Sequence, residues 1–351
     1  MKRLWCDPLH TPGAGEPTSR RLVSLLIASI VFAPASPAFA YLKFGVRLGD
    51  RQITLKWDQT PVRYFVSDSG VPGVSPGDFQ AAVGRAFSTW EAVPTASITY
   101  QLGGVTAARP LQDDGRSTLG FLEKPELDRV LAATSFLVDR VTGALVESDI
   151  FFNSSFAWSV SAGGETGRFD LETIALHEIG HLSGLGHSAI GETELRPEGG
   201  RRVLSKEAVM FPIAFPSGNI SDRVLRDDDI AGISDLYPAG DFSAATGSIS
   251  GLVTRDGQGL FGAHVVAFDP ATGRLVGNLT LNQQGQFSIA GLRPGPHIVR
   301  VEPLDDADLD GFFDTTKTTV DLDFRVSFLD RLVVVPRGGD SGTVEVKVVR
   351  K

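Results

Sequence analysis

The chain has 351 residues, of which 42% are hydrophobic and 21% charged, so it has the composition of a folded globular protein and the length for two domains. Its formal net charge is −9 at pH 7. Nucleic-acid binding requires a basic face, because the phosphate backbone is negative, so this charge excludes nucleic acid as an expected partner.

The first forty residues have the pattern of a secretory signal. Two arginines at 20–21 precede an apolar run at 22–32, and the small-residue sequence AFA at 38–40 is typical of a signal-peptidase site. We therefore expect a secreted or periplasmic protein. The apolar run is shorter than the ~20 residues that span a bilayer, so we expect no membrane anchor after cleavage, although an uncleaved N-terminal anchor is the alternative. Cys6 would leave with the signal, and the mature chain would have no disulfide.

The next segment predicts a strand, a helix and another strand. The sequences RQITLKW (51–57) and VRYFVSD (62–68) alternate apolar and polar residues, as strands do. Residues 79–92 place apolar side chains on one helical stripe, and 97–100 form the following strand. A right-handed crossover between the two flanking strands would make them a parallel pair. Three more strands are expected at Ser117–Leu122, Val130–Val138 and Leu145–Asn153.

Residues 170–188, DLETIALHEIGHLSGLGHS, contain three of the six histidines. Apolar residues recur there at helical spacing, and the Asp170 carboxylate is suited to cap the first turn, so we expect a helix. On a helix, His177 and His181 face the same way, so two imidazole nitrogens can converge on one ion. Glu178 lies one residue round from His177. Its carboxylate is therefore suited to contact a water bound to the metal, rather than the metal itself.

The segment continues with a third histidine. Gly184 can take the positive φ that turns the chain off the helix, which lets His187 return as a third ligand. Three neutral nitrogens leave a fourth position open, the pattern of a catalytic zinc site. A bare H-E-x-x-H also occurs by chance in unrelated helices, but the longer H-E-x-x-H-x-x-G-x-x-H is far more demanding.

This run resembles the zinc signature of the metzincin endopeptidases, and Ser188 after the third histidine resembles their matrixin branch. The stretches AFSTW, DGRSTLGF, LAATSFLVD and ESDIFFN echo the matrixins in the same order, over about residues 57–237. The resemblance implies an α+β fold, with a mixed, mostly parallel five-stranded twisted sheet and three helices. It also implies a Zn²⁺ cofactor and a peptide substrate that pairs with the edge strand Val130–Val138.

The resemblance extends to two later features and fails at others. Met210 lies where metzincins place the methionine of the turn beneath the zinc ligands, and residues 225–237 resemble the terminal matrixin helix. No histidine between His10 and His177 could hold a structural zinc, and no cysteine between residue 41 and His177 could keep the site latent. The loop 189–209 is longer than in typical relatives, which favours a surface insertion over a rim of the cleft.

A second domain is expected after a short linker at 238–247. From Ser248, short alternating strands separated by glycine-rich turns predict an all-β, immunoglobulin-like antiparallel sandwich. The stretches GSISGLVTRDGQGLFGAHVVAFD and GQFSIAGLRPGPHIVRVEP resemble the carboxypeptidase-regulatory-like sandwich found on secreted enzymes. His264 and His297 fall within these strands, and we interpret both as structural.

An acidic loop in this domain has alternating carboxylates that could wrap a calcium ion. The twelfth position of the loop is Lys317 and not the bidentate glutamate of an EF-hand, so a calcium site and a solvated loop both remain open. The candidate ligands are Asp306, Asp308, Asp310 and Asp314.

The sequence therefore predicts a signal peptide at 1–40, a matrixin-like zinc peptidase domain at 41–240 and a β-sandwich at 241–351. The expected activity is endopeptidase hydrolysis of proteins or peptides by a monomer. Glu178 would be the general base, and His177, His181 and His187 the zinc ligands. The alternative is a secreted peptide-binding or adhesion protein that uses a protease-like domain without cutting.

Overall fold

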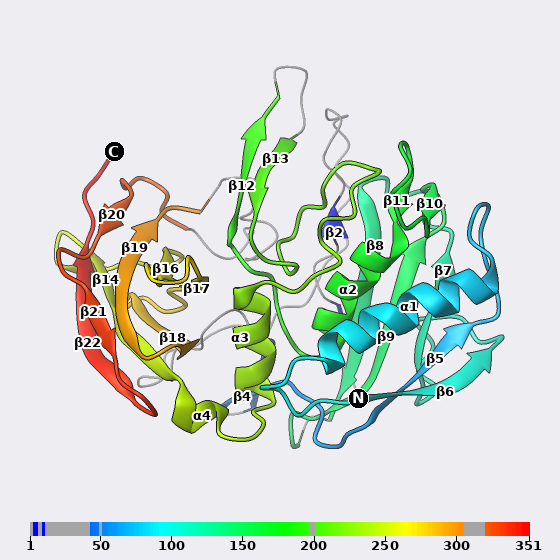
Figure 1. Ribbon diagram of the computed structural model, residues 1–351, viewed down its shortest axis with the longest axis horizontal. Coiled ribbons are helices and arrows are strands. Elements are labelled where there is room, and N and C mark those ends of the chain that lie inside the picture. The colour runs from blue at the N-terminus through cyan, green and yellow to red at the C-terminus, as the bar shows by residue number, and fades with distance from the viewer. Residues whose placement is uncertain are drawn as a thin grey trace.

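The computed structural model describes residues 3–5, 9–10, 43–48, 51–139, 141–196, 201–304 and 320–351. Figure 1 shows the two long helices beside one large sheet, with a separate group of strands at the opposite end of the molecule. Helix α3 (Asp227–Leu236) lies between the two groups. We call the strand group that begins at Gly247 the C-terminal β-region.

The large sheet contains the five strands that the matrixin resemblance implies. They run in the order β8-β9-β7-β5-β6, in which every neighbouring pair is parallel except β8 and β9. The expected parallel pairing of the first two strands around a crossover helix is confirmed. The strands are β5 (Val62–Ser67), β6 (Tyr100–Thr106), β7 (Ser117–Leu122), β8 (Val130–Val138) and β9 (Leu145–Asn153).

Two short strands from the predicted signal region extend this sheet at β8. Strands β1 (Arg3–Trp5) and β2 (Leu9–His10) both pair antiparallel with it. The remaining residues of the predicted signal, including Cys6, lie outside the described residues, so signal cleavage remains a prediction. Among the described residues, no helix is long and apolar enough to cross a membrane.

Two helices pack on one another and on the sheet. Helix α1 (Pro76–Glu91) begins at Ser75, whose hydroxyl caps the first turn by accepting from the Asp78 N–H. Its apolar stripe is buried, as the periodicity predicts, and Phe87 stacks on Tyr64 of β5 with ring centroids 3.8 Å apart. Helix α2 (Leu171–Leu182) is buried along its whole length and packs against α1 and against strands β8 and β9.

The long loop after the third histidine folds as a hairpin of β12 (Gly191–Leu195) and β13 (Arg201–Lys206). At its base, Lys206 forms an ion pair with Asp222, N–O distance 2.9 Å, and both side chains are almost fully buried. Val203 packs against Phe211 and Ile213. One face of the hairpin is therefore packed against the fold, while Glu194, Arg202 and Leu204 are exposed, as expected for a surface insertion. Small two-stranded pairs also form from β3 (Gly45–Leu48) with β4 (Arg51–Thr54), and β10 (Trp158–Ser159) with β11 (Phe169–Asp170).

The C-terminal β-region follows the short helix α4 (Phe242–Ala245) and consists of two sheets. One contains β14 (Gly247–Arg255), β15 (Gln258–Gly259), β18 (Gln286–Leu292) and β22 (Asp340–Lys347). The other contains β16 (His264–Phe268), β17 (Leu275–Leu279), β19 (Gly295–Glu302), β20 (Ser327–Phe328) and β21 (Val333–Val335). The strand pairs are antiparallel, as the sequence predicts, except that β22 runs parallel to β14. The candidate calcium ligands Asp306, Asp308, Asp310 and Asp314 lie outside the described residues.

A charged group stabilises the turn between β16 and β17. The Asp269 carboxylate is buried, accepts from the Ala271 N–H at 2.9 Å, and pairs with Nε and Nη2 of Arg293 at 2.9 and 2.8 Å. Burial alone would raise the pKa of Asp269, but these hydrogen bonds and the arginine charge outweigh it and lower that pKa to about 2.

We predict that Asp269→Asn lowers the free energy of unfolding at pH 7 by about 1–3 kcal/mol, because it removes a charge-assisted hydrogen bond. The folded pKa lies below the unfolded value, so this stabilisation is present above about pH 4 and is lost as the pH falls towards 2. Thermal unfolding at pH 7 and pH 2.5 measures the difference. Asp330→Asn, at an exposed side chain, is the control. Equal destabilisation at both pH values would contradict the prediction.

Candidate active site

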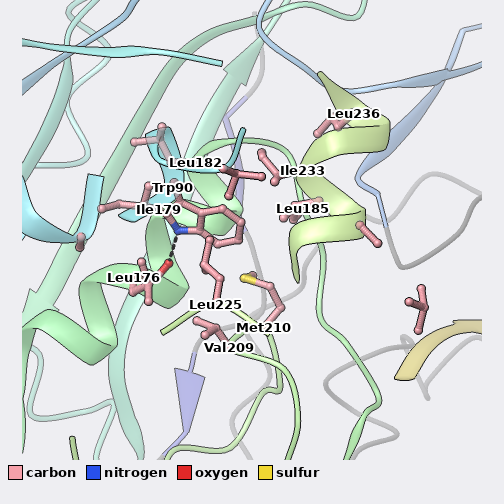
Figure 2. Close-up of a cluster of buried hydrophobic side chains, with 14 of the residues drawn as sticks. Trp90, Leu176, Ile179, Leu182, Leu185, Val209, Met210, Leu225, Ile233 and Leu236 are labelled. Carbon is pink, nitrogen blue, oxygen red and sulfur yellow. Dashed lines mark hydrogen bonds between the residues drawn. The ribbon is translucent and has the colours of Figure 1, made fainter. Parts of the chain in front are cut away.

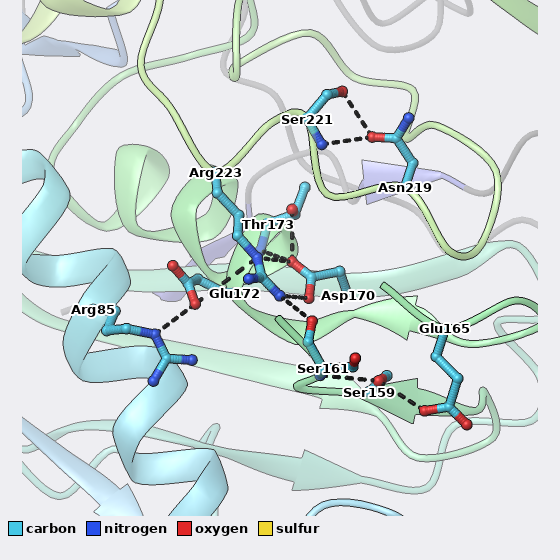
Figure 3. A network of polar contacts seen from close by, with 10 residues as sticks. All are labelled: Arg85, Ser159, Ser161, Glu165, Asp170, Glu172, Thr173, Asn219, Ser221 and Arg223. Carbon is cyan, nitrogen blue, oxygen red and sulfur yellow. Dashed lines mark hydrogen bonds and ion pairs between the residues drawn. The ribbon is translucent and has the colours of Figure 1, made fainter. Parts of the chain in front are cut away.

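The helix that carries the motif is anchored at its first turn. Asp170 caps α2 by accepting from the Thr173 N–H at 2.9 Å, as the sequence predicts. The same carboxylate is paired with Arg223, and the next carboxylate, Glu172, pairs with Arg85 of α1. Figure 3 shows these charges side by side, so the N-terminus of α2 is tied both to α1 and to the loop after Met210.

Close packing fixes the middle of the helix. The indole Nε1 of Trp90 donates to the Leu176 carbonyl at 2.8 Å, which Figure 2 shows beside the apolar side chains around it. Gly180, the glycine of HEIGH, faces the sulfur of Met210 and the Trp90 ring. A Cβ at this position would lie 2.2 Å from Met210 Sδ, so only glycine lets the helix lie directly on Met210.

The structure brings the three histidines together. His177, His181 and His187 are buried, and each offers a ring nitrogen within 4.8 Å of the other two. Nε2 of His181 and Nε2 of His187 are 3.2 Å apart. Two ligands on a tetrahedral zinc with Zn–N bonds of about 2.05 Å lie about 3.3 Å apart, so this spacing fits zinc.

Hydrogen bonds fix the orientation of two of these rings. Nδ1 of His177 donates to the Val209 carbonyl, and Nδ1 of His181 donates to the Leu185 carbonyl, both at 2.8 Å. A carbonyl can only accept, so both rings carry the proton on Nδ1 and leave the Nε2 lone pair for a metal. Nε2 of His177 is buried without a hydrogen-bond partner among the described residues, which is the state expected of a metal ligand.

Burial keeps these rings neutral. It lowers the pKa of His177 well below its usual value, with further lowering by the neighbouring His181, His187 and Lys206. Burial also lowers the pKa of His181 to about 4, although the hydrogen bond to the Leu185 carbonyl raises it. Only a neutral imidazole can bind a metal, so the site is ready for a cation at neutral pH.

Glu178 lies beside the histidines and is also fully buried. Its Oε2 accepts a hydrogen bond of 2.6 Å from the Thr134 hydroxyl on β8, and its Oε1 has no partner among the described residues. Burial raises the pKa of Glu178 to about 8, and the Thr134 bond opposes this rise. One carboxylate oxygen is thus held in place, while the other is left without a hydrogen bond among the described residues.

The chain leaves the helix as the sequence predicts. Gly184 has φ of 102°, and a Cβ there would lie 2.6 Å from the Leu55 carbonyl, so both the conformation and the space require glycine. The turn brings His187 back towards the helix. Next to it, the Ser188 N–H donates to the Met210 carbonyl at 2.9 Å. This bond ties the loop that carries His187, which we call the third-histidine loop, to the turn at Met210.

Acidic residues of α3 support the site. Asp229 accepts from the N–H groups of Val209 and Met210 at 2.8 and 3.1 Å, and so holds the turn beneath the histidines. Asp228 accepts from the Ser188 hydroxyl at 2.6 Å. Burial raises the pKa of Asp228 to about 7 and that of Asp229 to about 6.

Sequence reasoning missed three of these supporting residues. Two of them, Asp228 and Asp229, lie in the first turn of α3, where Asp229 also accepts from the Arg226 N–H. Their contacts with the site were not visible, because the partners are far away along the chain. Thr134 could have been noticed as a hydroxyl within the apolar run of β8, but nothing in the sequence pairs it with Glu178.

Comparisons with known proteins agree with this geometry. Residues 56–198 match the family model described as Matrixin. The chain is 26% identical to Metalloendoproteinase 4-MMP of Arabidopsis thaliana over 245 residues, which cover 65% of this chain and 62% of that protein. It is 29% identical to Metalloendoproteinase 1 of Glycine max over 174 residues, or 45% of each chain. It is 26% identical to interstitial collagenase of Oryctolagus cuniculus over 185 residues, or 52% of this chain and 33% of that one.

The chain thus spans less than two thirds of the length of these relatives. Among solved structures, the Bacillus anthracis TIE protein shares 17% identity at a TM-score of 0.19, over 30% of this chain and 17% of that one, a likeness too weak to bear on the fold. The residues that match the Matrixin model include His177, His181 and His187, the three histidines that converge in the structure and could hold a metal ion.

We predict that Gly180→Ala destabilises the protein by about 1–3 kcal/mol, because the new Cβ overpacks Met210 and Trp90 and outweighs the better helix propensity of alanine. Gly84→Ala in α1 is the matched control, because no atom lies within 4 Å of its Cβ position. The control should be about 0.5–1 kcal/mol more stable than the wild type. Denaturant unfolding compares the two, and a Gly180→Ala protein as stable as the Gly84→Ala protein would contradict this packing.

Proposed function

We propose that this protein is a zinc-dependent endopeptidase in which Glu178 is the general base. The observation that carries the proposal is the convergence of three buried histidines on one point, two of them on the helix that also carries the buried Glu178. The match of residues 56–198 to the matrixins and the similarity to metalloendoproteinases support it.

The residues of the site have separate roles in this proposal. His177, His181 and His187 would hold Zn²⁺. When bound, Zn²⁺ would supply an activated water, polarise the scissile carbonyl and favour the ionised form of Glu178. The free Oε1 of Glu178 would take a proton from the attacking water and pass it to the leaving amine, while Thr134 holds Oε2.

We further propose that the substrate is an extended peptide that pairs with β8. The edge of β8 can accept an antiparallel strand, since Arg3–Trp5 pairs there with residues 135–137. The next residue along β8, Thr134, donates to Glu178. A peptide on this edge would therefore lie beside the general base, held by main-chain hydrogen bonds that do not read its sequence.

The proposal also includes the finer expectations from the sequence. Cleavage of residues 1–40 would release a secreted or periplasmic protein. Residues 41–240 would be the peptidase domain, and residues 241–351 a carboxypeptidase-regulatory-like β-sandwich. The two sheets of the C-terminal β-region and the apolar core that they share support this last assignment.

We predict that Glu178→Gln lowers the rate of casein cleavage by about 10²- to 10⁴-fold and leaves zinc content and melting temperature near those of the wild type. Glutamine has nearly the same shape but cannot take the proton. The measurements are turnover of labelled casein and metal analysis of the purified protein. Native turnover by this variant would rule out the assigned role.

The same assay separates an enzyme from a binding protein. If the wild type cleaves casein and a chelator stops the cleavage, the activity depends on the metal, and restoring Zn²⁺ should restore it. Binding of casein without cleavage by the zinc-loaded wild type would instead support the alternative of a peptide-binding protein.

We predict that Thr134→Val lowers kcat by about 10- to 100-fold with little change in KM. It removes a hydrogen bond to a charged group, which contributes about 1.5–3 kcal/mol. Thr134→Ser keeps the hydroxyl and is the matched control, with kcat near the native value. Zinc content should be equal in all three proteins. A native kcat for the valine variant would show that Thr134 does not position Glu178.

A further inference from the structure

The C-terminal β-region lies against the loop that carries His187. A small cavity at this junction is lined by His187, Ser188 and Asp228 from one side and by His264, Gly277 and Asn278 from the other. The junction therefore joins the loop of the third histidine to strands β16 and β17.

A continuous series of hydrogen bonds crosses this junction. The Ser188 hydroxyl accepts from the Ile190 N–H at 3.2 Å and donates to Oδ2 of Asp228 at 2.6 Å. The other oxygen of Asp228, Oδ1, accepts from the Gly277 N–H of β17 at 2.9 Å. Both oxygens of one buried carboxylate are thus engaged, one by the residue after His187 and one by the C-terminal β-region.

The position of Gly277 in its sheet explains why its N–H is available. Within the described residues, β17 is an edge strand and pairs only with β16. An edge strand has main-chain groups that lack a sheet partner, and here one of them is satisfied by Asp228. The carboxylate therefore closes the edge of the sheet while it holds Ser188.

The absence of a side chain at Gly277 permits this close approach. A Cβ there would lie 2.7 Å from His264 Nε2 and 3.1 Å from Ile190 Cδ1. His264 is itself buried, held by Glu302 at Nδ1, and its Nε2 has no partner among the described residues. Alanine at this position would overpack both neighbours, which favours separation of β17 from the third-histidine loop.

Two further contacts join helix α3 to the C-terminal β-region. Arg274, at the end of the turn before β17, pairs with Asp227 of α3 at 3.1 Å. Gly291 of β18 lies against Ala231 of α3, where an added Cβ would be 3.1 Å from the alanine Cβ. Helix α3 is thus packed against strands β17 and β18 of the C-terminal β-region.

We propose that the C-terminal β-region is a structural component of the zinc site, in which Gly277 positions Asp228, and Asp228 positions Ser188 and thereby His187. This inference rests on the zinc site of the proposed function but not on its chemistry. Asp228 and Gly277 are positioning residues, because they touch the ligand loop and not the metal. Loss of such outer contacts usually weakens metal binding about 10- to 100-fold.

The test uses the full chain and two properties of the bound metal. Zn²⁺ affinity is measured by competition with a chromophoric chelator, and ligand geometry by the visible absorption spectrum of the Co²⁺-substituted protein. The variants are Asp228→Asn and Gly277→Ala. The controls are Asp227→Asn, which removes a charge from the same interface, and Gly339→Ala, whose Cβ would meet only Pro336 at an ordinary 3.5 Å.

We expect both test variants to bind Zn²⁺ about tenfold or more weakly and to change the Co²⁺ spectrum, and both controls to stay within about twofold of the wild type. If the two test variants melt at lower temperature but keep native Zn²⁺ affinity and the native Co²⁺ spectrum, the contact is only packing and the proposal is wrong. Because neither measurement depends on catalysis, this result is independent of whether casein is cleaved.

Ser188→Ala keeps the proposal testable should Gly277→Ala fail to fold. It breaks the same series of hydrogen bonds without touching the C-terminal β-region, so it should weaken Zn²⁺ binding by a similar factor. Where Gly277→Ala folds, the double variant with Ser188→Ala should bind Zn²⁺ no more weakly than the weaker of the two single variants, because both act through Asp228. Full additivity of the two effects would contradict a shared path through that carboxylate.

Discussion

The geometry of the site depends on satisfying the ring nitrogens of three buried histidines without water. Three imidazoles in a core must each direct one nitrogen to a common point, and the remaining polar groups must be satisfied without water. His177 and His181 meet this requirement by donating to the carbonyls of Val209 and Leu185. Neither carbonyl is in α2, so the ligands have their correct orientation only when the turn at Met210 and the loop after Gly184 are both folded. Local helix geometry brings the histidines close, and tertiary structure decides which nitrogen binds the metal.

Helix α3 supplies the charges that hold those two segments. Asp229 accepts from the Met210 turn, and Asp228 from the third-histidine loop and from the C-terminal β-region. Each carboxylate is buried and would be unfavourable alone, but each is satisfied by several donors. The cost of burying charge is therefore offset only in the assembled fold. This arrangement makes correct packing of three distant segments a condition for a correct zinc site.

The sequence predicted the elements of the fold better than the contacts between them. Strands β7, β8 and β9 have the predicted bounds, because each is an apolar run between clear turn signals. Strand β6 begins at Tyr100 and not at Ser97, because the Ser97 N–H donates to the Tyr237 carbonyl, outside the sheet. The HEIGHLSGLGH spacing predicted the convergence of the three histidines and the turn at Gly184, since both are set first by local geometry. Asp228 could not be predicted, because its partners lie 40 and 49 residues away with no periodic signal between them.

The edge of β8 connects the N-terminal segment, which the sequence predicts to be a signal, with the proposed activity. Arg3–Trp5 pairs with residues 135–137, next to the threonine that holds Glu178. An edge has one set of free main-chain groups, so these residues and a peptide substrate cannot pair there at the same time. Removal of residues 1–40, as the sequence predicts, would free this edge. The hydrogen bonds of Glu178, His177 and His181 to Thr134, Val209 and Leu185 would remain, because all of these partners lie after residue 40. Cleavage before Tyr41 would thus open the edge of β8 to a peptide substrate.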